Sequence, residues 1–168
     1  MNEIKAKFER IVDTLKAKPE LGRGTGKTTA RIAAGGLACE IESGPWKFKA
    51  DMPETSGGTA SGPTPGMYGR AALGGCLAIG YAMRAARAGL VLDALEVEVE
   101  ADYDDGALFG TVDKPPGYSE IRCIVRVRSS APEAEILKVL DESDRHSPYL
   151  DVFSRAQKVV RRVHVVPT

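Results

Sequence analysis

The sequence predicts an α+β fold, and three kinds of segment support this prediction. Residues 2–17 place apolar side chains at helical spacing, whereas several later segments alternate apolar and polar side chains as half-buried strands do. Residues 65–89 form a predicted helix that is apolar or small on nearly every side. Because helices and strands follow one another without an internal repeat, we expect helices packed on antiparallel sheets. The 168 residues suffice for one core, so a single domain, 1–168, is predicted.

The first twenty residues, 1–20, are predicted to be an amphipathic N-terminal extension. Lysines and glutamates cover one face of its helix. The opposite, apolar face consists of Ile4, Phe8, Ile11 and Leu15. A face of this kind packs against another element, so we expect a structural role.

The stretch "GRGTGKTT", residues 22–29, looks like a phosphate-binding loop but lacks its spacing. That loop requires G-x-x-x-x-G-K-[ST] after a buried strand. Leu21 occupies the first glycine position here, and a predicted helix precedes the stretch. We therefore interpret the stretch as a flexible connector that becomes a strand at "TTARIAA", with Lys27 in solvent.

Strands are predicted in "TTARIAA", "LACEIE" and "WKFKADM", with the turn "SGP" between the last two. Cys39 lies among apolar neighbours in the second of these segments, so a buried and inert thiol is expected. Residues 53–66, "PETSGGTASGPTPG", have loop composition. An irregular segment of this length is usually functional or mobile, and we expect a flexible loop.

The predicted central helix, "PGMYGRAALGGCLAIGYAMRAARAG", lacks a polar face and must therefore be surrounded by protein. Gly74, Gly75 and Gly80 each lower helix stability by ~1 kcal/mol relative to alanine, which indicates that another element approaches closely. Gly89 suits the C-terminal cap of this helix.

Three glutamates on the next strand, "LDALEVEVEADYDDG", raise the question of a metal or general-acid site. The strand "EIRCIVRVR" offers arginines in matching alternation, so cross-strand ion pairs are the simpler explanation. The glutamates are Glu96, Glu98 and Glu100, and the arginines are Arg122, Arg126 and Arg128. The same alternation directs Cys123 into the core. The turn "DYDDG" lacks the ligand spacing of a calcium loop and is predicted to lead, as a hairpin, into a strand at "ALFGTVD".

Two helices and a strand are predicted at the C-terminal end. "SAPEAEILKVLDES" opens with a capping box from Ser130 to Glu133. Its predicted buried stripe is Ile136, Leu137, Val139 and Leu140. In "HSPYLDVFSR", Ser147 is the predicted N-cap and Pro148 the first helical residue. "QKVVRRVHVV" is the predicted final strand, in which His164 has a structural role.

Charge and cysteine spacing exclude several classes of function. Lys plus Arg and Asp plus Glu both number 23, so no overall field attracts nucleic acid or a membrane surface. No apolar run reaches the ~18 residues of a membrane span, and we expect a cytoplasmic protein. The three cysteines are spaced neither as a zinc site nor as a secreted disulfide framework, so reduced thiols, no metal and no cofactor are expected.

Cys76, on the central helix, is the candidate for chemistry. The glycine pair beside it removes steric cover from its sulfur. A reactive thiol needs a nearby cation, a hydrogen-bond donor or a helix N-terminus to lower its pKa, and Arg31, Arg70 and His146 are the candidates. The alternative is that Cys76 is one more small residue in a tightly packed helix.

Three segments in this order resemble the OsmC/Ohr family of osmotically inducible protein C and organic hydroperoxide resistance proteins. They are "PTPGMYGRAALGGCLAIGYAMRAARAG", the strand "LEVEVEADYD" and "DRHSPYLDVF", and the likeness covers roughly residues 28–166. The resemblance implies an OsmC-like fold in which sheets from two intertwined chains enclose long central helices. It also implies a homodimer with active sites at the interface.

The resemblance further implies thiol-dependent reduction of organic hydroperoxides, with Cys76 as the attacking thiolate and a sulfenic acid as intermediate. The family's second cysteine corresponds to Ser147, and its carboxylate ten residues before the attacking cysteine corresponds to Gly66. The nearest counterpart of its arginine is Arg31, although Gly35 or Leu37 stands in the better-aligned place.

Two functions are therefore compared. The first is a one-cysteine hydroperoxide reductase in which an external thiol restores Cys76. The second is a non-catalytic binding protein for an apolar or acidic small molecule. The candidate binding residues are Arg31, Arg70, His146, Ser147 and Tyr149. A hydrolase built on Cys76 and His146 would follow nucleophile–base logic, but the sequence identifies no oxyanion hole or orienting acid for it.

Overall fold

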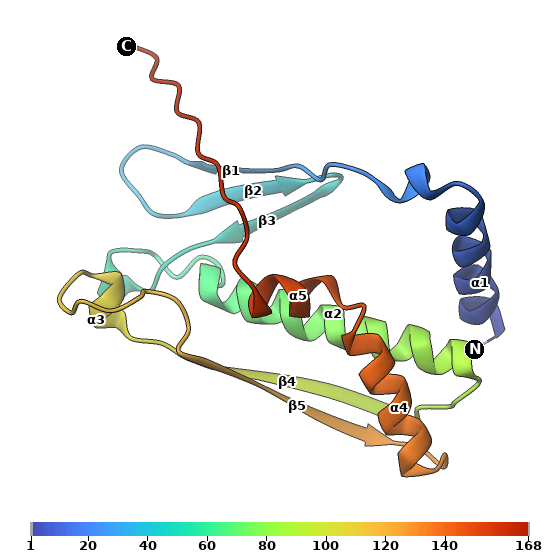
Figure 1. Cartoon of the computed structure of the whole chain (residues 1–168). Helices are drawn as coiled ribbons and strands as arrows, with labels where there is room; N and C mark the ends of the chain where they lie inside the picture. Colours follow the sequence, from blue (N-terminus) through green and yellow to red (C-terminus); the bar gives the residue numbers. More distant parts are fainter. Residues whose placement is uncertain (1, 168) are drawn as a thin grey trace.

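The long apolar helix α2 is the central element of the fold in the computed structural model, which describes residues 2–167 (Figure 1). The hairpin β4–β5 lies along one side of α2, the helices α4 and α5 pack against it, and α1 contacts it near its C-terminal end. The elements are α1 (Asn2–Ala17), η1 (Pro19–Gly22), β1 (Thr28–Ile32), β2 (Cys39–Ser43), β3 (Trp46–Ala50), η2 (Glu54–Ser56), α2 (Pro65–Ala88), β4 (Ala94–Asp102), α3 (Asp105–Leu108), β5 (Glu120–Arg128), α4 (Glu133–Asp144) and α5 (Pro148–Ser154). The predicted α+β class and most of the predicted elements are confirmed.

Helix α2 begins and ends as its sequence predicts. The Thr64 hydroxyl accepts a hydrogen bond from the backbone N–H of Met67, and Gly89 adopts the left-handed conformation at φ 79° that ends the helix. Leu73, Leu77 and Tyr81, spaced four residues apart, form a buried stripe with at most 3% exposure. Burying one such leucine contributes about 1.5–3 kcal/mol of transfer free energy, so this stripe anchors the core.

The close approaches predicted from the glycines of α2 are found at two of three positions. A Cβ atom at Gly74 would lie 3.2 Å from Val99 Cγ2 on β4, and one at Gly80 would lie 2.8 Å from Ser143 Oγ on α4. Gly75 faces open space, so the prediction is wrong there.

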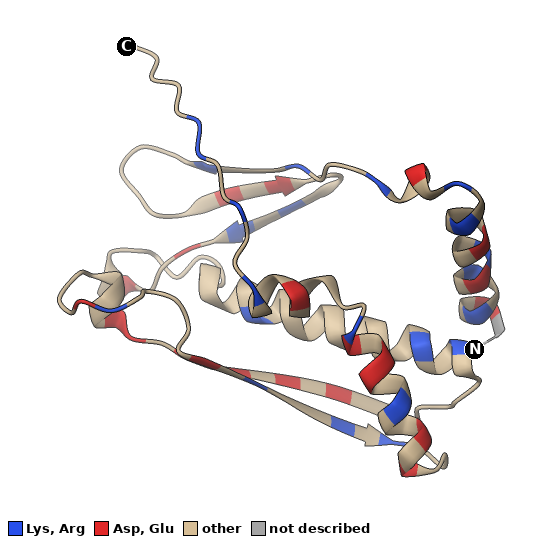
Figure 2. Ribbon diagram, viewed as in Figure 1, with Lys and Arg blue, Asp and Glu red and all other residues tan. Residues whose placement is uncertain are grey.

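The antiparallel pair β4–β5 confirms the predicted cross-strand ion pairs. Arg122 Nε lies 2.8 Å from Glu100 Oε2, and Arg126 Nη1 lies 2.7 Å from Glu98 Oε2. Figure 2 shows acidic residues on β4 facing basic residues on β5, while α2 is almost free of charge. Because these charges are largely exposed, the pairs fix the strand register more than they stabilise the fold.

The other sheet, β1–β2–β3, is an antiparallel meander that stands apart from most of α2 (Figure 1). Phe48 and Tyr68 join the two at a ring-centroid distance of 5.4 Å, and the Tyr68 hydroxyl donates to the carbonyl of Lys49 at 2.5 Å. Trp46 is 73% exposed at the far end of the sheet. One chain therefore leaves much of this sheet uncovered.

Two predictions about cysteines are wrong. Cys39 is half-buried rather than buried, because its sheet lacks a covering layer. Cys123 is exposed rather than part of the core, although partial burial raises the pKa of its thiol. Its strand face packs on α2 and α5 at Val125 and Ile121 but stays open at Cys123.

Two predicted strands are also wrong within residues 2–167. The segment "ALFGTVD" begins inside the short helix α3, where the Asp104 carboxylate accepts the N–H of Gly106 at 2.9 Å. The segment "QKVVRRVHVV" has strand alternation but pairs with no strand in the described part of the chain, and His164 lies in it. Its valines are exposed, including Val159 at 88% and Val165 at 87%.

The capping box predicted for α4 is wrong as well. Pro132 is the N-cap and no side chain caps the helix, while the neighbouring Ser129 hydroxyl accepts the N–H of Ala131 at 3.1 Å. Leu137, predicted to be buried, is 51% exposed. The N-cap predicted for α5 is confirmed, since the Ser147 hydroxyl accepts the N–H of Leu150 at 3.3 Å.

The predicted loop of residues 53–66 ends at Thr64, because Pro65 and Gly66 belong to α2, and it is tied down by one buried carboxylate. Asp51 is 2% exposed and accepts hydrogen bonds from the N–H of Met52 and from both the N–H and the hydroxyl of Thr59 and of Ser61, at 2.7–3.1 Å. These bonds, led by those from Ser61 and Thr59, hold the pKa of Asp51 well below its usual value. The loop thus enters α2 from a fixed point.

We expect Asp51→Asn to lower the thermal unfolding midpoint at pH 7 by several degrees, because an amide accepts these five hydrogen bonds less well than a carboxylate. A depressed folded-state pKa stabilises the protein above the unfolded value of about 4, and this contribution is lost as the pH falls below it. The difference from the unsubstituted protein should therefore shrink on acidification. Calorimetry at several pH values measures it, with the exposed Glu54→Gln as control; a difference independent of pH would contradict this account.

No helix among residues 2–167 combines the length and the apolar character that crossing a membrane requires.

Candidate functional site

Cys76 lies at mid-length on α2, half-buried, with its sulfur next to the start of α5. The distance from Cys76 Sγ to Ser147 Oγ is 3.5 Å. Ser147 is 7% exposed, and its oxygen already accepts the N–H of Leu150 as the N-cap of α5. Its hydroxyl proton is therefore available to the sulfur, so Ser147 can donate a hydrogen bond to a thiolate at Cys76.

A cavity of 370 Å³ opens beside this pair. Its walls come from α1, α2, the C-terminal end of α4 and the start of α5. They are formed by Phe8, Cys76, Ile79, Gly80, Met83, Arg84, Ser143, His146, Ser147 and Pro148. The cavity is thus mostly apolar, with one arginine, one histidine and two hydroxyl groups.

His146 is held at the rim by the last turn of α4. Its Nδ1 lies 2.9 Å from the carbonyl oxygen of Glu142 and 3.6 Å from Glu142 Oε1. In the tautomer protonated on Nδ1, the ring donates to this carbonyl and leaves Nε2 free for a ligand. His146 therefore faces the cavity with one available nitrogen.

Glu142 forms ion pairs with two arginines beside the cavity. Its carboxylate pairs with Arg84 at 3.2 Å and with Arg145, and these contacts, the one with Arg145 first, lower the pKa of Glu142. The Arg84 side chain is only 15% exposed and belongs to the cavity wall. Because Glu142 is ionised at neutral pH, it compensates much of the charge that Arg84 brings to the site.

The structure brings together three of the six predicted site residues, namely Cys76, His146 and Ser147. Arg31 pairs instead with Glu42 on the β1–β3 sheet at 3.0 Å.

The other two predicted binding residues also lie outside the cavity wall. Arg70 donates to the hydroxyl of Tyr118 at 3.4 Å near the start of α2, and Tyr149 is 44% exposed on α5. A chain by itself therefore assembles only half of the predicted set.

Gly66 has no side chain at the position where the resemblance implies a carboxylate. A Cβ atom there would lie 3.4 Å from the Tyr118 hydroxyl, which donates to the Gly66 carbonyl at 3.1 Å. Ten residues of helix separate Gly66 from Cys76, about 15 Å along the axis. Within one chain, this end of α2 is remote from the thiol.

Sequence reasoning missed four wall residues on α2 that share a face with Cys76. Ile79, Gly80, Met83 and Arg84 follow it by three, four, seven and eight residues. This helical spacing is a signal that identifies them once the helix is accepted. Phe8 and Ser143 come from other helices, and no local pattern connects them with Cys76.

Among residues 2–167, no group of three or more His, Cys, Asp or Glu side chains is arranged to hold a metal ion. The polar groups that line the cavity are one thiol, two hydroxyls, an imidazole and a guanidinium.

The fold and the site define an α+β protein with a thiol on its central helix, facing an apolar cavity. The chain belongs to the OsmC-like protein family, whose model matches residues 58–161. No curated protein sequence matches the chain significantly. The resemblance seen in the sequence, that of a divergent member, is thereby confirmed.

Solved structures agree with this assignment. The OsmC-like protein from Mycoplasma pneumoniae is similar with a TM-score of 0.66 and 17% identity, over 78% of this chain and 88% of that chain. An organic hydroperoxide resistance protein from Legionella pneumophila has a TM-score of 0.55 and 15% identity, over 77% and 89%. One from Elizabethkingia anophelis has a TM-score of 0.58 and 15% identity, over 77% and 87%. At these identities the likeness establishes the OsmC-like fold.

Ser147→Cys is expected to create a cysteine pair that can form a disulfide. Cys76 Sγ and Ser147 Oγ already lie 3.5 Å apart, so a small side-chain movement would bring two sulfurs to the ~2.05 Å of a disulfide bond. Mild oxidation should remove two titratable thiols, and non-reducing peptide mapping should join residues 76 and 147. The double variant Cys76→Ser/Ser147→Cys is the matched control and should keep its thiols. Failure to form the disulfide would show that the two side chains do not meet in solution.

Proposed function

We propose that this protein is a one-cysteine organic hydroperoxide reductase of oxidative-stress defence. The single observation that carries this proposal is the placement of the Cys76 sulfur against the Ser147 hydroxyl at the wall of an apolar cavity. Cys39 and Cys123 lie on separate sheets and outside this cavity, so neither is placed to resolve an oxidised Cys76. An external thiol is then required.

The reaction balances without a cofactor. The thiolate of Cys76 attacks the outer oxygen of ROOH, the O–O bond breaks, the sulfur is oxidised to a sulfenic acid, and the peroxide is reduced to ROH after protonation of the alkoxide. A small thiol then displaces water from the sulfenic acid and forms a mixed disulfide. A second thiol releases Cys76 as thiolate and leaves as the oxidised disulfide.

One group lies directly against the attacking sulfur. The Ser147 hydroxyl can donate a hydrogen bond to the thiolate, whereas the charge of Arg84 on the cavity wall is offset in part by Glu142. An apolar wall favours an alkyl or aryl hydroperoxide over hydrogen peroxide, since burial of the organic group is favourable.

A cytoplasmic location, where thiols stay reduced, fits the three free cysteines.

A specific observation favours a second candidate, a binding protein without peroxidase activity. Gly66 and Ser147 replace the carboxylate and the second cysteine that the resemblance implies, and Arg70 and Arg31 lie outside the cavity wall. The cavity would then bind an apolar or acidic small molecule through His146 and Ser147. A ligand that remains bound through purification supports this candidate.

The proposed active form is a homodimer. Ile79, on the Cys76 face of α2, is 63% exposed, although a helix this apolar should be covered. The exposed valines of residues 157–166 and the open β1–β3 sheet offer further uncovered apolar surface. Surfaces of this kind mark association sites, so a second copy of the chain explains all three.

Cys76→Ser is expected to abolish consumption of cumene hydroperoxide in the presence of a dithiol, because the attacking sulfur is gone. Cys39→Ser and Cys123→Ser are the matched controls and should keep full activity. A coupled assay of remaining peroxide measures this, and mass spectrometry after brief peroxide exposure should locate the added oxygen on residue 76. Equal activity in all three variants, or none in the unsubstituted protein, rejects the reductase and leaves the binding protein.

The dimer is tested separately by light scattering coupled to size exclusion. The unsubstituted protein should elute with twice the chain mass, and Val163→Asp should shift the equilibrium toward the monomer, because a carboxylate is costly to bury in an apolar contact. Val163→Thr, of similar shape, is the control and should remain mostly dimeric. A monomeric unsubstituted protein at micromolar concentration would contradict the proposal.

A further inference from the structure

The N-terminal helix α1 reaches the Cys76 cavity with one side chain. Phe8 is half-buried and is the residue of α1 that belongs to the cavity wall, which Ile79, Met83 and Pro148 also line. Helix α1 lies outside residues 58–161, the part of the chain that matches the family model. This wall is therefore a feature of the present chain rather than of the matched domain.

Two arginines of α2 hold the ring of Phe8. The guanidinium carbon of Arg87 lies 4.9 Å from the ring centroid, and that of Arg84 lies 5.6 Å from it. Both are within the range of cation–π attraction. The ring is thus fixed at the end of α2 by charge as well as by apolar contact.

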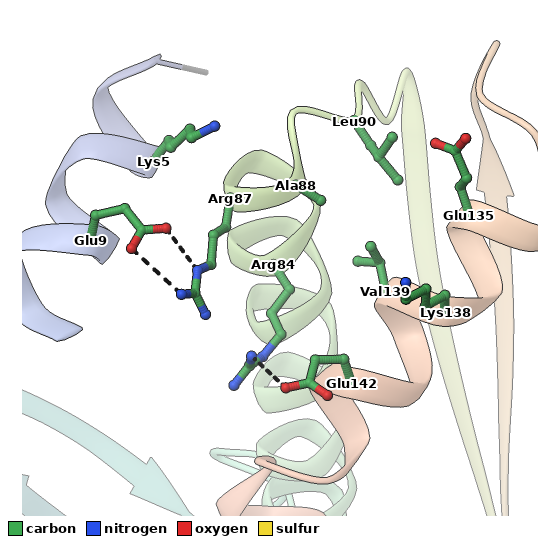
Figure 3. A pocket seen from close by; sticks show the side chains of 10 residues that line it. All are labelled: Lys5, Glu9, Arg84, Arg87, Ala88, Leu90, Glu135, Lys138, Val139 and Glu142. Carbon is green, nitrogen blue, oxygen red and sulfur yellow. Dashed lines mark hydrogen bonds and ion pairs between the residues drawn. The ribbon is translucent and has the colours of Figure 1, made fainter.

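A forked ion pair reinforces this contact. Arg87 Nε lies 2.8 Å from Glu9 Oε1, and Arg87 Nη2 lies 3.5 Å from Glu9 Oε2. Figure 3 shows this pair joining α1 to α2, and the Arg84–Glu142 pair joining α2 to α4. Arg84 therefore links the Phe8 ring to α4, the helix that ends two residues before His146.

Other apolar side chains of α1 are less well covered. Ile4 and Ile11, on the same predicted apolar face, are 46% and 53% exposed. An open cavity of 580 Å³ lies beside the Glu9–Arg87 pair and is lined by residues of α1, α2 and α4, among them Lys5 and Lys138 (Figure 3). The contacts of Phe8 and Glu9 are therefore important for the position of α1.

The geometry points to Phe8 as a specificity-determining residue. Its ring closes the α1 side of the Cys76 cavity, so that only compact organic hydroperoxides reach the thiol. With a volume of 370 Å³, the cavity is at the small end of ligand sites, so one aromatic ring decides what fits. This inference rests on the proposed reductase only for the identity of the substrate. The steric role of Phe8 is independent of catalysis.

Thiol alkylation tests the wall without any peroxide. In a Cys39→Ser/Cys123→Ser background, Cys76 is the remaining thiol, and its rates with methyl methanethiosulfonate and with N-phenylmaleimide report small and bulky access. Phe8→Ala should raise the bulky-to-small rate ratio by roughly tenfold, the scale on which an apolar pocket discriminates by size. Ile11→Ala, one turn along α1 and exposed, is the matched control and should leave the ratio unchanged.

Glu9→Gln provides a second variant that keeps the ring but weakens its anchor, and its ratio should rise by less than that of Phe8→Ala. If Phe8→Ala fails to fold by circular dichroism, Glu9→Gln decides the outcome alone. An unchanged ratio in the folded variant, or an equal rise in Ile11→Ala, overturns the inference.

Peroxide kinetics then connect the wall to the substrate. Phe8→Ala should raise kcat/KM for cumene hydroperoxide relative to tert-butyl hydroperoxide, in parallel with the alkylation ratio. If no variant turns over peroxide but Phe8→Ala still alters the alkylation ratio, the reductase activity is rejected and the steric role of Phe8 is retained. If the enzyme is active but Phe8→Ala changes neither the kcat/KM ratio nor the alkylation ratio, the steric role of Phe8 is rejected and the reductase activity is retained.

Discussion

The close contact between Gly80 on α2 and Ser143 on α4 is the constraint on which the site depends. A Cβ atom at residue 80 would lie 2.8 Å from the Ser143 oxygen, so any larger residue would force the buried Ser143 side chain to shift. The chain leaves α4 at this point, and four residues after Ser143 the N-cap Ser147 meets Cys76, which lies one turn before Gly80. A glycine that weakens the central helix thus positions the partner of its thiol.

Glu142 offsets part of the positive charge beside the cavity, which gives hydrogen bonding the main role at the thiol. Glu142 shares the charges of Arg84, Arg145 and, when it is protonated, His146. A carboxylate so paired cancels much of the positive field that would otherwise stabilise a thiolate. The hydroxyl of Ser147, which lies against the sulfur, is therefore the most direct stabilising group that one chain supplies to Cys76.

The sequence identifies α1, α2, both strands of the β4–β5 pair and the N-cap at Ser147, because periodicity and capping are local properties. It places Cys76 and Ser147 in one site only through the family resemblance. It fails where burial depends on distant elements: Cys123 has the alternation of a core residue but lacks a cover, and residues 157–166 have the alternation of a strand but lack a neighbour. The cavity wall from Phe8 is a meeting of two helices far apart in sequence, which no local pattern encodes.

Ile79 connects the proposals on assembly and on chemistry. It follows Cys76 by three residues on the same helix face, lines the same cavity and is 63% exposed. Covering such a side chain contributes about 1.5–3 kcal/mol, so a second chain that buries it gains stability from the apolar surface beside the thiol. Whatever covers Ile79 must also form a wall of the Cys76 cavity. In the proposed dimer, the second chain would therefore complete the side of the cavity that Ile79 lines, whereas Phe8 lines the cavity from within one chain.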